Sequence, residues 1–412
     1  MLNEFEFDWT FPLAPKILGF EEQFPCKFIP SYIMFLVSPA MFKLYMVAAI
    51  FLSFVLWYLI KKIQSMFSRI LRIADFIEPY LYMSGNNLSR ILERCSWTTS
   101  SIFAYPWLNS GISHMKLALA KSEPLAESAF ERELLLAPNG STVAVDWFNH
   151  PEDVVKDFQG IVIIFTHGLT RDLSRQLINS VLRQTPLQRL SVCIVTVQGS
   201  NGIALSSPQT GLRLSALIEF KAATERINQH LGSSFPKAAV ACSIGAIPVV
   251  EYIEQEKSGY SSMILISTPL DVGRFAVDEN EVTDYLLNQG KQILKDNADV
   301  LTRSDIEDFS KATDATTLNE FLTHAVGKAS IGTWDPYRSL DAIQRPTLML
   351  YALDDESIQF STSIDLVRLC RNPNIAVAVT EVGGHCGFQF LQSDWLANCI
   401  CEFASSASKP VL

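Results

Sequence analysis

The chain lacks both a dense basic segment and cysteines with the spacing of zinc-ligand pairs. Its 412 residues include 33 Lys and Arg against 43 Asp and Glu, which gives a net charge of −10. Because a nucleic-acid partner requires a dense basic face, this balance argues against one. The eight cysteines are scattered, at positions 26, 95, 193, 242, 370, 386, 399 and 401, and suit neither a disulfide framework nor the paired ligands of a zinc site. We therefore expect free thiols, no metal and no other cofactor.

Charged residues of either sign are also scarce, at 18% of the chain, whereas 48% of the residues are hydrophobic. No internal repeat and no low-complexity segment stands out in the sequence. A chain of this length and composition is expected to fold as one large domain with an appendage.

The appendage is a long uncharged run near the N-terminus. Leu44–Ile60 contains no charged residue, and its apolar character extends upstream to Ser31 with one Pro and one Lys as breaks. This length spans a bilayer. The run starts too far into the chain, and lacks the small-residue cleavage site, for a removable signal peptide. We predict a single-pass transmembrane anchor at residues 31–62 after a tail of residues 1–30, with a buried core helix as the alternative.

Charges on either side of the anchor indicate its orientation. Acidic residues precede the run, and basic residues, among them Lys61 and Lys62, follow it. The positive-inside rule then places the bulk of the chain in the cytoplasm. We expect the membrane to be the endoplasmic reticulum or another endomembrane. Two matches to the glycosylation pattern, Asn87-Leu88-Ser89 and Asn139-Gly140-Ser141, point to the opposite side. Residues 63–130 are predicted to form a membrane-proximal helical segment.

From residue 131 onward the chain alternates strand-like and helix-like stretches. Glu133–Ala137 and Thr142–Trp147 flank Asn139-Gly140, a strong hairpin signal. Six apolar runs follow, separated mostly by stretches with helical spacing: Ile161–Phe165, Val192–Val197, Ala238–Cys242, Met263–Ser267, Thr347–Ala352 and Ile375–Thr380. We predict an α/β domain at residues 131–408, with a mostly parallel eight-stranded sheet in the strand order of an alpha/beta-hydrolase fold.

One interval in this domain, Leu270–Asp341, is too long for a crossover between two strands. Its helical parts are Val282–Leu301 and Asp305–Val326. We predict that residues from about 270 to 341 form a helical cap over the site.

The stretch Lys237–Glu254 has the pattern of a nucleophile elbow, in which a short apolar run meets Ser243 and an apolar-periodic run follows. In this strained turn between a strand and a helix, the positions two residues either side of the nucleophile must be small. Ala241 and Gly245 meet that demand, whereas framing the turn on Cys242 would put branched residues at both positions. We therefore predict Ser243 as the nucleophile.

Two partners for this serine follow it in the chain. A hydroxyl nucleophile needs a base, and the base needs a buried carboxylate, in the chain order Ser, acid, His. Asp355 follows the strand-like run Thr347–Leu353, and we predict it as the acid, with Asp354 as the alternative. His385 lies among glycines that let the backbone bring its imidazole over the sheet, and we predict it as the base.

An oxyanion hole is predicted from two backbone N–H groups. The run Ile161–Thr170 is a strand ending in His-Gly, from which this kind of site takes one N–H, and the residue after the nucleophile supplies the other. The predicted donors are Leu169 and Ile244, whereas His167 is expected to brace the loop.

With these residues the chain resembles the alpha/beta-hydrolase-domain lipases and esterases that have a single N-terminal membrane anchor. The resemblance covers roughly Ser101 to the end of the chain. Besides the elbow it is found in Pro106–Gly111, Glu133–Trp147, His167–Thr170, Thr317–Phe321, Trp334–Arg338, Leu353–Asp355 and Gly383–Phe388. The chain departs from the family at Ala241 and Ala246, where the family has glycine, and at Val197–Ser200, which lacks the family's Arg.

The resemblance implies hydrolysis of acylglycerol, phospholipid or smaller carboxylic esters through an acyl-enzyme formed by Ser243, Asp355 and His385. We therefore expect a membrane-anchored serine hydrolase acting on lipid or small esters. The alternative is a catalytically weak hydrolase fold that serves as a lipid-binding receptor or scaffold. An intact triad favours the enzyme, because only chemistry requires all three residues together.

Overall fold

The computed structural model describes residues 48, 51–62, 78–100, 102–103, 108, 110–121, 129–167, 171–199, 202–205, 216–255, 259–271, 274–275, 279–301, 309–327, 335–390 and 394–409. The chain divides into two compact units, Met1–Ser68 and Arg69–Leu412. The second unit contains all the strands that the structure describes.

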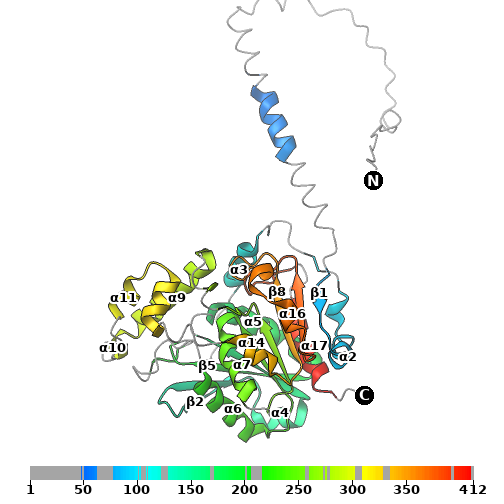
Figure 1. The fold of residues 1–412 in the computed structure, drawn as a ribbon, viewed down its shortest axis with the longest axis vertical. Coiled ribbons are helices and arrows are strands. Elements are labelled where there is room, and N and C mark those ends of the chain that lie inside the picture. The colour runs from blue at the N-terminus through cyan, green and yellow to red at the C-terminus, as the bar shows by residue number, and fades with distance from the viewer. Residues whose placement is uncertain are drawn as a thin grey trace, which may run out of the picture. The chain divides into compact units, whose positions relative to one another are not determined.

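In the described residues one sheet organises this second unit (Figure 1). Its strands are β1 (Tyr80–Tyr82), β2 (Glu131–Leu136), β3 (Thr142–Trp147), β4 (Gly160–Thr166), β5 (Leu190–Val197), β6 (Lys237–Cys242), β7 (Ser262–Ile266), β8 (Thr347–Ala352) and β9 (Ile375–Thr380). They lie in the order β1-β9-β8-β7-β6-β4-β5-β3-β2. The block from β5 through β4, β6, β7 and β8 to β9 is parallel, and β1, β2 and β3 are antiparallel to their neighbours. This is the mostly parallel alpha/beta-hydrolase fold, as predicted.

The hairpin between β2 and β3 forms at the predicted turn. Gly140 has a φ of +80°, a conformation that favours glycine, and its N–H donates to the Ala137 carbonyl at 2.9 Å. The N–H of Ala137 donates to the Ser141 carbonyl at 2.8 Å, which sets the register that pairs Leu136 with Thr142. The local Asn-Gly signal was therefore sufficient to place this turn.

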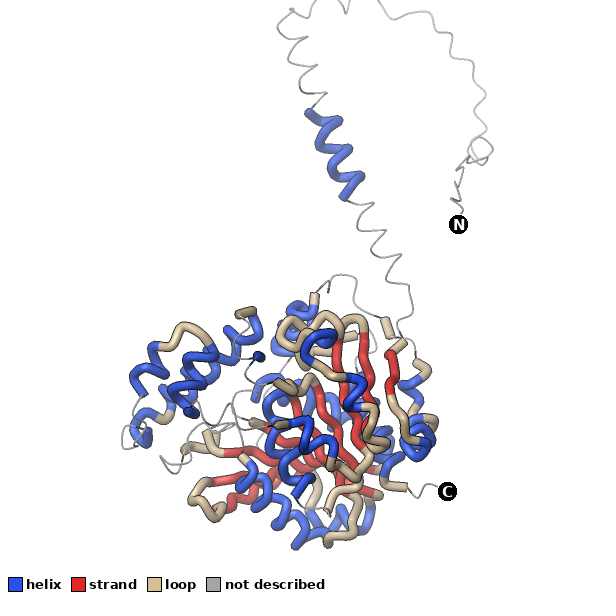
Figure 2. The backbone as a smooth tube through the Cα atoms, viewed as in Figure 1, coloured by secondary structure: helices blue, strands red, loops and turns tan. Residues whose placement is uncertain are grey.

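Helices cover the sheet on both faces (Figure 2). Outside the cap they are α2 (Asn86–Leu92), α3 (Gly111–Ala120), α4 (Pro151–Asp157), α5 (Arg171–Gln184), α6 (Leu217–Leu231), α7 (Ala246–Gln255), α14 (Pro336–Asp341), α15 (Phe360–Ser363), α16 (Leu366–Leu369) and α17 (Trp395–Ala407), with short 3-10 turns at Ser96–Thr98, Thr185–Gln188 and Ser243–Gly245. On one face α5 and α17 pack together over β4, and on the other α6 packs against α4, α7, β3 and β5. The strands from β4 to β9 are buried along their whole length, which explains their continuous apolar runs.

The prediction of eight strands was wrong, because the described residues form nine. The additional strand, β1, lies within the segment predicted to be helical and membrane-proximal, and it pairs antiparallel with β9, with Tyr80 opposite Val379. The same segment packs on α17, since the Trp97 and Trp395 rings meet edge to face with centroids 6.1 Å apart. A strand of three residues is too short to show an alternating pattern, so its partner strand decides its conformation.

Between β7 and β8, in the interval predicted to be a cap, the chain forms a group of helices that lie together in yellow in Figure 1 and are called the cap below. They are α9 (Glu281–Asp296), α10 (Ala298–Leu301), α11 (Phe309–Asp314), α12 (Leu318–Leu322) and a π-helical turn at Thr323–Gly327. Gly290 allows α9 to approach α12 closely, since a Cβ there would lie 2.4 Å from the buried ring of Phe321. The cap thus has a small core of its own.

In the first unit, residues 51–62 are helical, and their large apolar side chains are exposed. Among the residues that the structure describes, no helix is both long enough and apolar enough to cross a membrane. Much of the predicted anchor, residues 31–47 and 49–50, lies outside the described residues.

Candidate active site

Ser243 stands at the sharp turn between β6 and α7. It follows the last residue of β6 directly and begins the 3-10 turn that leads into the helix. Its φ is +52°, a left-handed conformation that is strained for a residue with a Cβ. The side chain is fully buried, with 0% of its surface exposed. This backbone geometry is that of the elbow which the small residues around Ser243 predict.

The imidazole of His385 lies between Ser243 and Asp355. Its Nε2 is 2.8 Å from the Ser243 hydroxyl oxygen, and its Nδ1 is 3.0 Å from Oδ2 of Asp355. His385 is 1% exposed and Asp355 3% exposed, so the pair is shielded from water. Three predicted residues, from the loops after β6, β8 and β9, therefore meet in one hydrogen-bonded chain at the carboxyl edge of the sheet.

The two adjacent aspartates have different partners. The second carboxylate oxygen of Asp355, Oδ1, accepts the N–H groups of Ser357 and Ile358, each at 3.0 Å. Asp354 instead accepts the backbone N–H of Gly384 at 2.8 Å, so it holds the loop beside the histidine rather than the imidazole. Burial raises the pKa of Asp354 to about 6. The geometry favours Asp355 over Asp354 as the partner of His385.

The loop that presents His385 passes very close to the rest of the backbone. Gly384 has a φ of +61°, and a Cβ there would lie 1.9 Å from the carbonyl oxygen of Gly111. A Cβ on Gly111 would in turn lie 1.9 Å from the carbonyl oxygen of Asp354. Gly111 was not predicted as part of the site, although it ends the Pro106–Gly111 motif. Only glycine fits at this contact between three segments.

The surroundings of His385 favour its charged form. Burial opposes the imidazolium, but the Asp355 carboxylate, through its charge and its hydrogen bond, raises the pKa of His385 well above its ordinary value. The ring of Phe275 lies over the imidazole, with the ring centroids 5.8 Å apart and the planes tilted by 31°. Phe275 was not predicted as a site residue, and it adds apolar cover to the histidine.

Of the two predicted oxyanion donors, Ile244 lies in the 3-10 turn after Ser243 and is buried. Its N–H belongs to the first turn leading into α7, where backbone N–H groups have no partner within the helix. Leu169 lies outside the described residues. His167, at the end of β4, is buried, and the imidazole beside Ser243 belongs to His385.

In the described part of the chain, no three His, Cys, Asp or Glu residues are placed to hold a metal ion. Seven cysteines are described and all are free. Burial raises the pKa of Cys386, next to His385, well above its usual value, so this thiol stays protonated and is a poor nucleophile.

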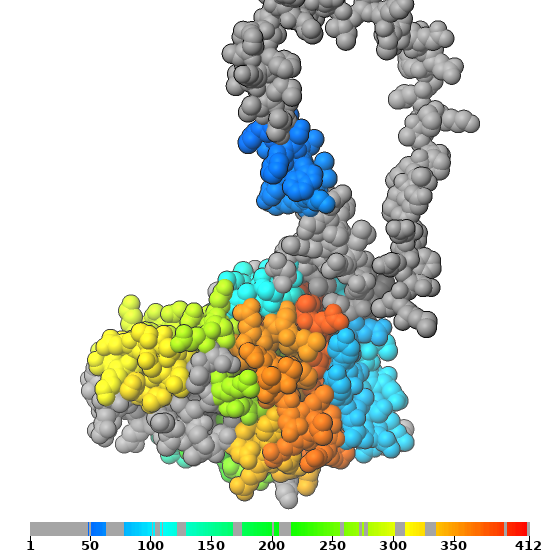
Figure 3. Space-filling view, turned by 45° about the horizontal axis from the view of Figure 1, so that its top comes forward, coloured from blue at the N-terminus to red at the C-terminus, as the bar shows by residue number. Residues whose placement is uncertain are grey.

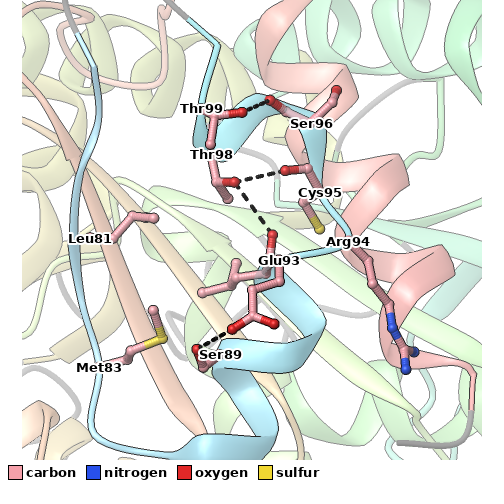
Figure 4. Close-up of a pocket in the computed structure, with 10 residues that line it drawn as sticks. Leu81, Met83, Ser89, Glu93, Arg94, Cys95, Ser96, Thr98 and Thr99 are labelled. Carbon is pink, nitrogen blue, oxygen red and sulfur yellow. Dashed lines mark hydrogen bonds between the residues drawn. The ribbon is translucent and has the colours of Figure 1, made fainter.

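A separate groove lies between β1 and the segment from α2 to Thr99 (Figure 4). Its volume is about 480 Å³, and it is lined by Leu81, Met83, Ser89, Leu92, Glu93, Arg94, Cys95, Ser96, Thr98 and Thr99. Glu93 accepts a hydrogen bond from Ser89 at 3.1 Å, and burial raises the pKa of the Cys95 thiol to about 11. These ten residues include no histidine, and the Ser89 hydroxyl is paired with a carboxylate rather than with an imidazole, so the elbow remains the candidate active site.

Comparisons with known proteins point to lipid hydrolases, although no protein-family model matches the chain. It is 23% identical over 355 residues to mouse phospholipase ABHD3, covering 78% of this chain and 81% of the relative, and 22% identical to the human phospholipase ABHD3, covering 77% and 80%. The solved esterase Pf2001 of Pyrococcus furiosus is 12% identical, with a TM-score of 0.45 over 66% of this chain and 88% of the esterase.

Proposed function

We infer that this chain, which belongs to the alpha/beta-hydrolase-domain lipases and esterases, is a serine hydrolase that cleaves carboxylic esters of lipids. The observation that supports this function best is the buried chain of contacts from Ser243 through His385 to Asp355, at 2.8 Å and 3.0 Å. The phospholipases named above support lipids as the substrate class.

In the proposed reaction the Ser243 oxygen attacks the ester carbonyl carbon while His385 Nε2 takes the hydroxyl proton. Asp355 accepts the Nδ1–H of His385 and stabilises the imidazolium that forms. The N–H of Ile244, with that of Leu169, stabilises the oxyanion of the tetrahedral intermediate. The imidazolium then gives its proton to the leaving alcohol, and an acyl-enzyme on Ser243 remains. Water activated by His385 hydrolyses this acyl-enzyme and restores the serine.

Labelling of the full-length protein with a fluorophosphonate probe tests this function. The probe forms a covalent bond with a serine only where a base activates the hydroxyl, so the enzyme is expected to be labelled at Ser243. A folded protein that the probe does not label would instead support the alternative, a hydrolase fold that binds lipid without useful turnover.

The substrate prediction follows from the apolar cover of the site. Phe275 lies beside His385, and each acyl CH₂ that leaves water for apolar surroundings contributes about 0.8 kcal/mol. We therefore expect kcat/KM to rise with acyl length from acetyl toward lauroyl esters of p-nitrophenol, assayed below their aggregation limits. A steady fall in kcat/KM along this series would exclude a lipase and leave a hydrolase of small esters.

The proposal includes a membrane anchor at Leu44–Ile60, with the catalytic domain on the cytoplasmic face of an endomembrane. The uncharged run supports it, as do the exposed apolar side chains of residues 51–60, which would gain from contact with lipid. We expect the protein to stay in the pellet when membranes are extracted with alkaline carbonate. Release into the supernatant, under conditions that retain a known integral protein, would contradict the anchor.

A further inference from the structure

The N-terminus of the cap helix α9 is hydrogen-bonded to the loop that contains Asp355. The hydroxyl of Ser357 donates to Oδ1 of Asn280 at 3.0 Å, across 77 positions of the sequence. Asn280 is the N-cap of α9, whereas Ser357 is a buried residue of the loop after β8. This bond joins the cap directly to the candidate active site, and Figure 3 shows the cap in yellow and the segment after β8 in orange on one face of the molecule.

Ser357 also contacts the candidate active site, through a second hydrogen bond to Asp355. The backbone N–H of Ser357 donates to Oδ1 of Asp355 at 3.0 Å. The other oxygen of Asp355 is the one that faces Nδ1 of His385. A displacement of Ser357 would therefore move one of the two backbone donors that fix the carboxylate, and so change the aim of the carboxylate at the imidazole.

The bond is not needed to cap α9. Oδ1 of Asn280 already accepts the N–H groups of Val282 at 3.0 Å and Thr283 at 3.1 Å, and the Thr283 hydroxyl accepts the N–H of Asn280 at 2.9 Å. This capping box satisfies the helix end by itself. The short helix α12 has a capping box too, in which Thr317 accepts the N–H of Glu320 at 3.2 Å. Thr317 therefore provides a matched cap residue in the same lobe.

The far end of α9 is also attached to the sheet's carboxyl edge. Asn297, the C-cap residue, accepts the N–H of Leu205 at 2.9 Å, and its amide donates to the Ile293 carbonyl at 2.8 Å. Leu205 lies in the segment after β5. The helix thus bridges the loops after β5 and β8, and its seating is fixed at both ends.

We propose that Asn280 and Ser357 are positioning residues for the reaction, which make the orientation of Asp355 toward His385 depend on the seating of the cap helix α9. The proposal rests on the proposed hydrolase function and names residues that neither contact the reacting atoms nor belong to the predicted triad. Because α9 is part of the cap, a substrate that displaces the cap would also weaken the contacts that orient the Asp355 carboxylate toward His385.

Ser357→Ala is the first test, made on the full-length protein with a short p-nitrophenyl ester. It removes the hydroxyl but keeps the N–H to Asp355. We expect kcat to fall about three- to tenfold, the effect of losing one net hydrogen bond, with KM nearly unchanged. The titratable groups that face His385 are the Asp355 carboxylate and the Cys386 thiol, and the thiol stays neutral because burial raises its pKa. A looser Asp355 favours the imidazolium less, so the midpoint of the pH profile of kcat/KM should move to lower pH.

Variants of Asn280 approach the same bond from the cap. Asn280→Ala should reproduce both effects, and the double variant with Ser357→Ala should lose little more than either alone, because both remove one interaction. Asn280→Asp still caps α9 and still offers an oxygen to the Ser357 hydroxyl. Unlike Asn280→Ala, it should therefore keep kcat within about twofold of the wild-type value. Thr317→Ala removes a cap without a bond to the acid loop, so it should lower Tm but leave the pH midpoint in place.

The outcomes separate this proposal from the function on which it rests. If Ser357→Ala and Asn280→Ala leave kcat and the pH midpoint unchanged while Ser243→Ala is inactive, the coupling is wrong and the hydrolase stands. The coupling is also wrong if these variants merely lose stability, as Thr317→Ala does, with an unmoved pH midpoint. Activity that survives in Ser243→Ala would instead contradict the proposed serine-hydrolase function.

Discussion

Replacing Ser243 by alanine is expected to lower kcat by at least about 10⁴-fold, the scale of such losses in serine hydrolases. The alanine keeps the turn but leaves His385 without a hydroxyl to deprotonate, so no acyl-enzyme can form. Hydrolysis of a short p-nitrophenyl ester by the purified full-length variant measures the loss, and fluorophosphonate labelling should disappear with it.

Cys242→Ala is the matched control, because it changes the neighbouring residue at the end of β6 and removes the other nucleophile near the turn. This variant should keep both labelling and most of the activity. Full esterase activity in Ser243→Ala, or loss of activity only in Cys242→Ala, would show that Ser243 is not the nucleophile.

Asp355→Asn is expected to lower kcat by about 10⁴-fold, as an amide in place of the acid does in a triad of this kind. The amide cannot accept the Nδ1–H of His385 as a carboxylate does and does not stabilise the imidazolium. Oδ1 of Asp355 accepts the N–H groups of Ser357 and Ile358, and an amide oxygen at that position can still accept both, so the loop should remain folded with the amide NH2 group facing His385. The pH dependence of kcat/KM reports the loss of the acid, whereas Tm reports any loss of stability, so measuring both separates an effect on catalysis from one on folding.

Asp354→Asn is the paired variant. Its carboxylate accepts the N–H of Gly384, which an amide oxygen can do as well, and it has no contact with the imidazole among those described. We expect this variant to keep activity within about tenfold. If Asp354→Asn proves inactive while Asp355→Asn keeps its rate, the acid has been assigned one residue too late in the chain.

The parts of the fold that the sequence predicted are those with a strong local pattern. The runs Thr347–Ala352 and Ile375–Thr380 are strands with the predicted bounds, because a strand buried on both faces needs an unbroken apolar run. The hairpin turn needed only Asn139 and Gly140, whose backbone preferences select it. The elbow at Ser243 needed only small residues at the crowded positions of the turn.

The long-range contacts of the site have no local pattern. Ser243 and His385 are 142 positions apart, and Ser357 and Asn280 are 77 apart, so that only the packing of the sheet and cap brings them together. Phe275 and Gly111 escaped prediction for the same reason. The role of each is visible only against the partner that it touches.

The sequence by itself determined the succession of buried strands from β4 to β9 along the chain, the elbow at Ser243 and the chain order of a serine, an acid and a histidine, because these follow from apolar runs and from the steric demands of a turn. Only the tertiary structure decided that β1 joins the sheet, and that Asp355 rather than Asp354 faces the imidazole. The pairing of β1 depends on the free edge of β9, which is distant in the sequence. Asp354 and Asp355 are adjacent but point in different directions, and which of them faces the imidazole depends on where the loop with Gly384 and His385 lies.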